Sequence, residues 1–231
     1  MYREEALEVI EVREKLSLFD LTHTISSDMP VYPGDVEPAM QYVATIGKDG
    51  FNVTKMTLGS HTGTHVDAPR HFVKNGEAID SIPLQKLVGD GVVLDLSYKK
   101  VGSGITERDL EPFSSLVREG DRVILYTGSS EQWGKQGAER NFTYLEPSGA
   151  RWLVKRKVCV VGIDCPSIDK FGSEDPVSHR TLLGNSVPLV ESLSSETRKL
   201  AGRRIHLVCL PLKVAGRDGA PARVIARPME E

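Results

Sequence analysis

The pattern of hydrophobic positions changes from a helical period near the start of the chain to strand-like runs over most of the remainder. In residues 1–16, Leu7, Ile10 and Leu16 recur at helical intervals between charged residues, which predicts an amphipathic N-terminal helix. The later runs alternate or are rich in β-branched residues, as strands are. The predicted strands lie within residues 15–25, 41–47, 52–63, 91–97, 121–128, 157–164, 204–215 and 222–228.

Two further helices are predicted between the strands. Residues 105–120 place Thr106 before an acidic first turn and Gly120 at the end, and residues 148–157 begin with Ser148 as the expected N-cap. Each helix is followed directly by an apolar strand, an order that favours parallel or mixed pairing with helices covering a sheet. We therefore expect an α/β fold: a single domain over residues 1–231, in which helices cover a mixed, strand-rich sheet.

The composition is that of an ordinary globular protein, with 231 residues, 39% hydrophobic and 26% charged. The net charge is −3 and the basic residues are scattered, which argues against a nucleic-acid partner. No apolar run approaches the roughly 18 residues that span a bilayer, and the charged start is unlike a signal peptide. We expect no membrane partner and a cytoplasmic protein.

The three cysteines, Cys159, Cys165 and Cys209, are an odd number and lie far apart or inside apolar runs. They are typical of small buried hydrophobic residues in a reducing compartment. A catalytic or zinc-binding role for Cys165, which Asp164 and Pro166 flank, is the weaker alternative because no CxxC pair supports it.

Three of the six histidines fall within residues 61–71, and His61, His65, Asp67 and His71 all occupy odd positions there. In an extended chain these side chains share one face. A helix would separate Asp67 from the histidines, and the glycine, β-branched residues and proline of this segment also disfavour a helix. The segment is therefore predicted to be extended, with its imidazole and carboxylate groups converging.

Imidazole and carboxylate together suit a cation such as Zn²⁺ or Mn²⁺, and three protein ligands leave room for a water. Such a cation makes water a nucleophile near neutral pH. The alternative interpretation is a polar, exposed loop whose histidines bond to backbone carbonyls. The clustering favours the metal site, because that alternative suits a single histidine better than three.

The segment SHTGTHVDAPRH, residues 60–71, resembles the signature of the metal-dependent cyclase family, which includes bacterial kynurenine formamidases (arylformamidases) and isatin hydrolases. Other blocks resemble the family in the same order: residues 28–35, 162–169, 178–193 and 209–226. The resemblance spans about residues 18–227. It implies the family's swivelling β/β/α-like fold, with one or two Zn²⁺ or Mn²⁺ ions per chain.

The resemblance also implies individual ligands. His61, His65 and Asp67 would bind a first metal, and Asp67 and Glu191 would bridge to a second, which His179 completes. From spacing alone, His179 and Glu191 carry little signal, and Glu191 is equally well read as a solvated strand end.

Two further roles follow from the resemblance. His71 matches the family's proton donor and acceptor, although residue type alone does not distinguish it from a fourth ligand. Tyr32 matches a substrate-contacting position at which the formamidases often carry tryptophan; packing against the neighbouring prolines is the alternative.

The remaining candidates are weaker. Asp164 and Ser167 follow a strand, where α/β sites gather, but either could shape a turn. Structural roles are expected for His23 and His206, each bonded to backbone, and packing or subunit contacts for Trp133 and Trp152.

The expected activity is hydrolysis of a C–N bond in a small amide, namely an N-formyl aryl amine or a cyclic amide, by metal-activated water with His71 as acid and base. No GxSxG elbow is present, which disfavours a serine hydrolase. The alternatives are lactam opening of the isatin type, a cyclase or dehydratase reaction, or a protein that binds metal for structure only. The relatives assemble, so we expect a homodimer or larger oligomer.

Overall fold

The central sheet closes on itself because β12 (Gly219–Pro228) pairs with both β11 (Arg204–Pro211) and β4 (His65–Asp67). The computed structural model describes residues 17–230, and the helix predicted at 1–16 lies outside them. The barrel runs in the order β12, β11, β5 (Val88–Asp95), β7 (Arg122–Tyr126), β9 (Val160–Ile163), β10 (Leu189–Glu191) and β4. The short β1 (Phe19–Asp20) adds to β12, so little of the predicted strand at 15–25 forms.

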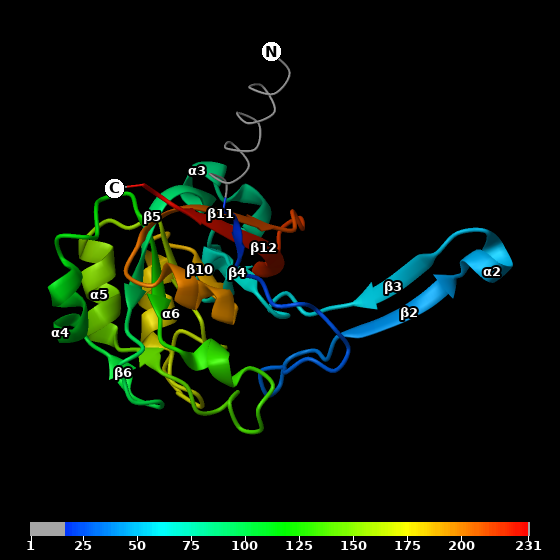
Figure 1. Cartoon of the computed structure of the whole chain (residues 1–231), viewed down its shortest axis with the longest axis horizontal. Helices are drawn as coiled ribbons and strands as arrows, with labels where there is room; N and C mark the ends of the chain where they lie inside the picture. The colour runs from blue at the N-terminus through cyan, green and yellow to red at the C-terminus, as the bar shows by residue number, and fades with distance from the viewer. Residues whose placement is uncertain (1–16, 231) are drawn as a thin grey trace, which may run out of the picture.

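Strands β5, β7, β9 and β10 are parallel, with Val92 opposite Val123 and Val123 opposite Val161, whereas β4, β11 and β12 pair antiparallel. Each parallel strand is reached through a connection on the outside of the barrel, where the helices lie (Figure 1). The expected mixed α/β architecture with helices covering the sheet is confirmed.

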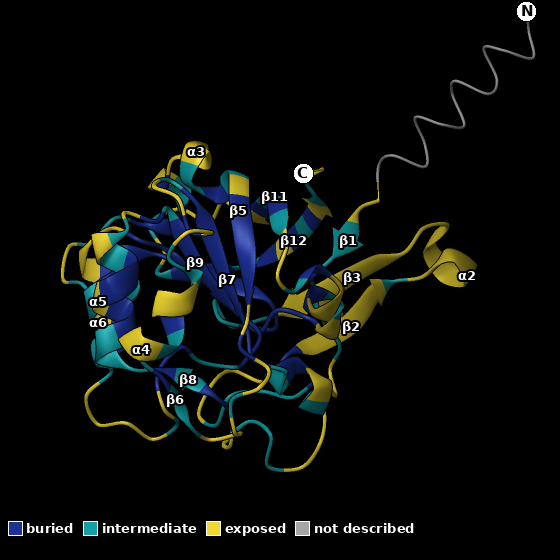
Figure 2. Cartoon of the chain, turned by 60° about the vertical axis from the view of Figure 1, so that its left-hand side comes forward, coloured by how far each residue is buried: buried dark blue, intermediate teal, exposed yellow. Residues whose placement is uncertain are grey.

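Alternation along the strands produces two hydrophobic cores. Val93, Ile124 and Val160 point into the barrel and contact side chains of β11 and β12. Their neighbours, such as Val92 and Val161, point outward and pack beneath the helices, and in Figure 2 strands β7 and β9 between these layers are buried along their whole length. On the outer face of the barrel, side chains of the strands therefore meet side chains of the helices and loops.

The outer helices are shorter than predicted. The expected helix at 105–120 forms only α4 (Glu107–Leu110) and the 3-10 helix η3 (Glu111–Phe113), since Pro112 cannot continue the hydrogen bonding. Thr106 is the N-cap, as predicted, and its backbone N–H donates to Asp109 at 2.7 Å.

Helix α5 (Pro147–Lys155) starts before the predicted N-cap. The cap is Glu146 rather than Ser148, because Pro147 has its φ preset for the first helical position. Helix α6 (Val177–Gly184) was not predicted from the sequence. The remaining short helices are α3 (Leu84–Leu87), η1 (Pro69–His71), η2 (Ile79–Ser81), η4 (Ser129–Gln132) and η5 (Ser195–Leu200).

Two small sheets lie outside the barrel. Strands β6 (Gly104–Ile105) and β8 (Tyr144–Leu145) pair near α4. Strands β2 (Ala39–Ala44) and β3 (Val53–Thr57), with α2 (Ile46–Asp49) at the tip, form a hairpin that projects far from the barrel (Figure 1). Among residues 17–230, no helix combines the length and apolar character needed to cross a membrane.

Candidate functional site

Strands β4 and β10 present different chemistry on their two faces. Val66 and Val190 point into the barrel, whereas His65, Asp67 and Glu191 point to the outer face. Glu191 lies directly opposite His65 in the antiparallel register, so the alternation of both strands brings these side chains together. All three are buried, at 0 to 4% exposure, and the interpretation of Glu191 as a solvated strand end is therefore wrong.

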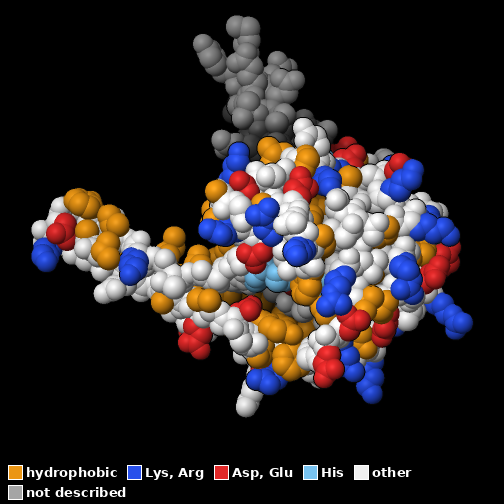
Figure 3. Space-filling model, turned by 180° about the vertical axis from the view of Figure 1, so that it is seen from behind, with side chains coloured by type: hydrophobic (Ala, Val, Ile, Leu, Met, Phe, Trp, Pro, Cys, Tyr) orange, Lys and Arg blue, Asp and Glu red, His pale blue; other side chains and the backbone are white. Residues whose placement is uncertain are grey.

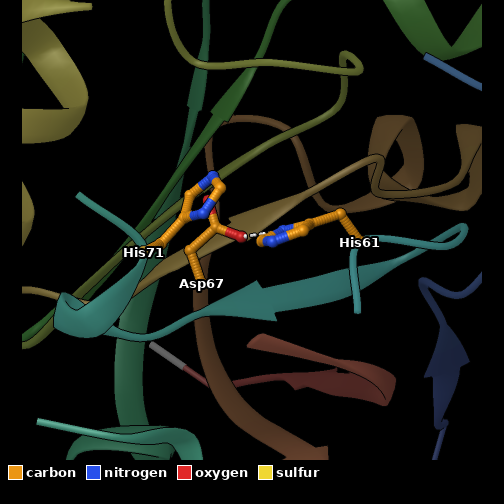
Figure 4. A group of neighbouring side chains, drawn as sticks. All are labelled: His61, Asp67 and His71. Atoms are coloured by element: carbon orange, nitrogen blue, oxygen red, sulfur yellow. Dashed lines mark hydrogen bonds and ion pairs between the residues drawn. The ribbon is translucent and has the colours of Figure 1, made fainter. Parts of the chain in front are cut away.

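Only part of the segment 61–71 is extended. The strand covers His65–Asp67, while His61 lies in the preceding turn and His71 in η1, which begins at Pro69. The predicted fully extended segment is therefore wrong, because Pro69 starts a helical turn. The side chains nevertheless converge: His61 Nδ1 lies 2.7 Å from Asp67 Oδ1 (Figure 4), and the ring centroids of His61 and His71 lie 4.1 Å apart.

Gly219 makes room for His61. A Cβ at this position would lie 2.8 Å from the Val66 carbonyl oxygen and 3.0 Å from His61 Cε1. Any larger residue in this part of β12 would therefore displace the His61 ring or break the β4–β12 pairing that closes the barrel.

The ring of His65 is fixed by a backbone contact. Its Nδ1 lies 2.8 Å from the Gly63 carbonyl oxygen, and since a carbonyl can only accept, Nδ1 carries the proton. Nε2 lies 3.2 Å from Asp67 Oδ1 and 3.6 Å from Glu191 Oε2. Gly63 adopts a left-handed φ of +64°, which turns this carbonyl toward the imidazole.

His179 is brought to the same place by α6 and is fixed by Asp169. One Asp169 oxygen accepts from the backbone N–H and from Nδ1 of His179, at 2.9 and 2.6 Å, and the other accepts from the Ser178 N–H. Asp169 thus caps the first turn of α6, which begins after Pro176, and orients the imidazole. His179 Nε2 then lies 3.2 Å from Glu191 Oε1 and 3.5 Å from Asp67 Oδ2.

These contacts fit a divalent cation. With Nδ1 of His65 and of His179 acting as donors, each neutral ring directs the lone pair of Nε2 at buried carboxylates, which also carry lone pairs. Asp67 Oδ2 has no hydrogen-bond partner among the described residues. One ligand atom each from His65, Asp67 and Glu191, or from His61, Asp67 and His71, lies within 4.8 Å of the others. A cation between them would satisfy lone pairs that otherwise face one another.

The charges of the cluster shift one another's pKa values. Burial lowers the pKa of His65, but Asp67 and Glu191 outweigh it and raise this pKa to about 10. Burial raises the pKa of Asp67, but His61 and His65 hold it well below its usual value. The negative carboxylates therefore hold protons on the neighbouring imidazoles when no metal ion is present. A bound metal ion would supply the same positive charge in place of those protons.

His71 lies at the open side of the cluster. Its side chain is 27% exposed, and its ring centroid lies 4.1 Å from that of His61 and 4.4 Å from that of Phe72. A cavity of about 370 Å³ reaches the cluster here, lined among others by His65, His71, His179 and Glu191. Figure 3 shows histidine side chains at the hollowed surface, beside the root of the hairpin.

Asp218 and Asp169 complete the site but were not singled out in the sequence. Asp218 Oδ2 lies 2.8 Å from His61 Nε2 and 3.7 Å from His71 Nδ1, and Ser60 donates to it at 3.1 Å. Both aspartates lie within blocks that resemble the family, but their spacing does not distinguish them from other acidic residues. A carboxylate that orients a histidine is recognised by its contact with that histidine, and the sequence does not show contacts between distant segments.

Tyr32 lies between two cavities. It lines the cavity above the cluster and a neighbouring one of about 220 Å³ that Trp133 also lines. Its ring packs at a tilt against Phe171, with centroids 5.5 Å apart. Trp133, whose predicted role was packing or subunit contact, stacks on His23 at 3.8 Å and forms a cavity wall.

The other candidates make hydrogen bonds within the fold. The buried Asp164 carboxylate accepts two hydrogen bonds each from Thr127 and Ser130, and so shapes the turn after β7. Ser167 lines the larger cavity, and its carbonyl accepts from the Cys165 thiol, whose pKa burial raises. His206 bonds to the Asp90 carboxylate rather than to backbone, and Trp152 packs in the outer core and donates to Glu111.

Comparison with known proteins identifies the family. Residues 19–170 match the family described as "Putative cyclase". A kynurenine formamidase from Salinibacter ruber is 30% identical over 92% of this chain and 98% of its own, and cyclase-like protein 1 from Arabidopsis thaliana is 32% identical over 93% and 86%.

Solved structures agree with this assignment. One described as a potential metal-dependent hydrolase with cyclase activity is 30% identical, with a TM-score of 0.78 over 93% of this chain and 99% of its own. An isatin hydrolase bound to thioisatinate reaches a TM-score of 0.86 over 99% and 98% at 20% identity, which shows a shared fold. The matched residues, the barrel and the ligand cluster lead to one conclusion: this chain belongs to the cyclase family.

Proposed function

We propose that this enzyme, a metal-dependent hydrolase of the arylformamidase type, cleaves the formyl C–N bond of N-formylkynurenine to give kynurenine and formate. The observation that carries the proposal is the arrangement of two imidazoles, fixed by Gly63 and Asp169, whose Nε2 atoms face the buried carboxylates of Asp67 and Glu191 beneath an open cavity. Formamidases among the relatives match nearly the whole chain and support the substrate class.

We propose Zn²⁺ or Mn²⁺ as the cofactor, at one or two sites. His61 and His65 face one oxygen of Asp67, and His179 faces the other, which supports Asp67 as a bridge between two ligand sets. Glu191 divides its oxygens between His65 and His179 in the same way. When bound, a divalent cation at this position polarises a carbonyl oxygen and lowers the pKa of water.

We propose that His71 moves the protons. It lies next to the ligand cluster yet reaches the cavity, so its imidazole can take a proton from the attacking water and deliver it to the departing amine nitrogen. Asp218, 3.7 Å from His71 Nδ1, limits the orientations of that ring. Tyr32, on the wall of the same cavity, is the proposed contact for the aryl group.

The cavity favours catalysis over a purely structural metal site. Structural sites close their coordination with protein ligands, whereas this cluster is open to about 370 Å³ on one side. We further propose a homo-oligomeric, cytoplasmic enzyme acting on a small-molecule amide; the three free cysteines are consistent with a reducing compartment.

The experiment measures hydrolysis of N-formylkynurenine and of isatin by protein that has been chelated and then reloaded with Zn²⁺ or with Mn²⁺. Formamidase turnover that depends on added metal is the expected result. Opening of isatin instead would replace the proposed substrate with a lactam. Metal binding without turnover of either compound would reject both substrates.

The variant His71→Ala tests the proton-transfer role. We expect turnover to fall about 100- to 10,000-fold with metal content unchanged. His206→Ala is the matched control, because His206 is similarly exposed and also faces an aspartate, but lies on β11 away from the cavity. Loss of metal from His71→Ala would instead indicate that His71 is a metal ligand. Its ring lies close enough to His61 and Asp67 for that role.

A further inference from the structure

A second cavity adjoins the one above the ligand cluster and is defined here as the side compartment. It measures about 220 Å³, against about 370 Å³ for the cavity above the cluster. Tyr32, Asp35 and His61 line both cavities, so the two meet at these three side chains. A single small molecule can therefore extend from the cluster, past Tyr32, into the side compartment.

The two cavities differ in the chemistry of their walls. Of the ligand cluster, only His61 lines the side compartment. Apolar side chains form much of its wall: Met29, Pro30, Val31, Val36 and Trp133. Binding pockets for small molecules are typically apolar, with a few polar groups that fix the orientation of the ligand. The side compartment is therefore suited to the apolar part of a substrate whose reacting bond lies above the cluster.

The ring of Trp133 is held in a fixed place on this wall. It stacks on the His23 imidazole, with centroids 3.8 Å apart and an angle of 9° between the ring planes. Burial lowers the pKa of His23 to about 4, so the stacked imidazole is neutral. The backbone N–H of His23 donates to Thr64 Oγ1 at 2.9 Å, and Thr64 directly precedes the ligand His65. The aromatic wall is thus tied to the segment that carries the ligands.

Four acidic or basic side chains line the side compartment besides His61: Asp35, Lys135, Glu139 and Asp164. The Asp164 carboxylate accepts its four hydrogen bonds from within the fold. The Lys135 ammonium donates to Gln132 at 3.0 Å, and Glu139 lies 3.4 Å from Arg140. Three of the four charges therefore already have partners.

Asp35 is the remaining charge, and no ion pair within residues 17–230 involves it. It lies where the two cavities meet, beside Tyr32, with Trp133 on the wall of the side compartment. Carboxylates and the faces of aromatic rings are the groups that bind ammonium ions in proteins. The junction of the two cavities is therefore suited to a ligand that carries an ammonium group.

We propose that the side compartment binds the ring of an aromatic amine whose side chain carries an ammonium group, with Trp133 against the ring and Asp35 against the ammonium. Kynurenine, the amine product of the proposed reaction, has its aromatic nitrogen and its side chain on adjacent ring carbons. With the ring in the side compartment, both substituents point back to the junction. The nitrogen then lies toward the cluster and the ammonium toward Asp35. The inference rests on the proposed function for the bond that is cut, but binding of the amine requires no turnover.

The first test is isothermal titration calorimetry of the metal-loaded protein with kynurenine and with desamino-kynurenine, in which hydrogen replaces the ammonium group. Wild type is expected to bind kynurenine at least about 10-fold more tightly. Asp35→Asn should remove this preference. Glu139→Gln is the matched control and should keep it, because Glu139 lines the same compartment but already has Arg140 as its partner. Equal affinities in wild type, no binding of either compound, or a preference that survives in Asp35→Asn would overturn the proposal.

The second test concerns Trp133 as the residue that determines specificity for the ring. Trp133→Ala is expected to bind kynurenine about 10-fold more weakly with its metal content unchanged. Trp133→Phe keeps an aromatic ring on this wall and should retain most of the affinity. Unchanged affinity in Trp133→Ala, or a loss that Trp133→Phe does not restore, would contradict the assigned role.

The two tests separate this inference from the proposed function. A protein that binds kynurenine through Asp35 and Trp133 but does not hydrolyse N-formylkynurenine would reject the proposed reaction and leave the side compartment as a binding site. Formamidase turnover that neither Asp35→Asn nor Trp133→Ala changes would reject the side compartment and leave the reaction standing.

Discussion

Asp67 and Asp164 are both buried carboxylates near the ends of barrel strands, but their surroundings differ. Every contact of Asp164 is a hydrogen-bond donor, since Thr127 and Ser130 each donate twice to it. Asp67 instead faces the imidazoles of His61, His65 and His179, and its Oδ2 has no hydrogen-bond partner in the described structure. The carboxylate of Asp164 has all its hydrogen bonds supplied by its own chain, whereas Asp67 Oδ2 is free to bind the proposed cation.

The comparison teaches how a functional carboxylate is distinguished from a structural one. Burial alone raises the pKa of Asp164, whereas the histidines around Asp67 outweigh burial and lower its pKa. The kind of partner is therefore more informative than burial, because imidazoles stabilise a buried carboxylate only while they are cationic, and a metal ion would have to supply that charge when they are neutral.

The largest expected effect is that of Asp67→Asn. The variant should lose bound metal and with it essentially all turnover, because the proposed bridging oxygens are replaced by a neutral amide. Metal content by elemental analysis, measured beside Asp164→Asn, checks this. If Asp67→Asn retained the wild-type metal content, the contrast between the two carboxylates would be lost.

Asp169→Asn should have the next largest effect. Asp169 orients His179 through Nδ1 without belonging to the proposed ligand set, so metal affinity is expected to fall about 10- to 100-fold. Competition with a chromophoric chelator measures the affinity. Glu131→Gln provides a control, since Glu131 also accepts a side-chain hydrogen bond, from Tyr126, but lies outside the ligand cluster. Unchanged affinity in Asp169→Asn would show that helix α6 positions His179 unaided.

Asp164→Asn should affect stability instead. In this variant an amide N–H group would face an N–H or O–H donor that now donates a hydrogen bond to the carboxylate. Losing that hydrogen bond costs about 1–3 kcal/mol of unfolding free energy. Urea unfolding of the chelated proteins measures this cost. Metal affinity in Asp164→Asn should stay at the wild-type value, and a tenfold loss would make Asp164 part of the site after all.

The smallest expected effect concerns His23, which burial keeps neutral by lowering its pKa to about 4 from the ordinary 6.5. Between these values the unfolded chain binds a proton that the folded chain does not, so His23 lowers stability as the pH falls from 6.5 toward 4. Unfolding of wild type and His23→Gln at several pH values should show their difference changing in this window only. A pH-independent difference would mean that His23 titrates normally in the folded protein.

How far the site follows from the sequence differs between residues. His65 and Asp67 could be placed on one face because alternation along a strand is a local property of the backbone. His61 and His71 converge with them for another reason, since one lies in a turn and the other in η1 after Pro69. His179 and Glu191 entered through resemblance alone, because helix α6 was not evident in the hydrophobic pattern.

The sequence by itself determined the residue types of the ligand cluster, the apolar strands and the order of helix and strand that makes part of the sheet parallel. Each of these depends on backbone geometry over a few residues. Only the tertiary structure decided that β12 closes the barrel onto β4, that Asp169 and Asp218 orient histidines, and that the hairpin of β2 and β3 projects from the barrel. These features join segments far apart in the chain, and the local pattern of polar and apolar residues does not specify which distant segments meet.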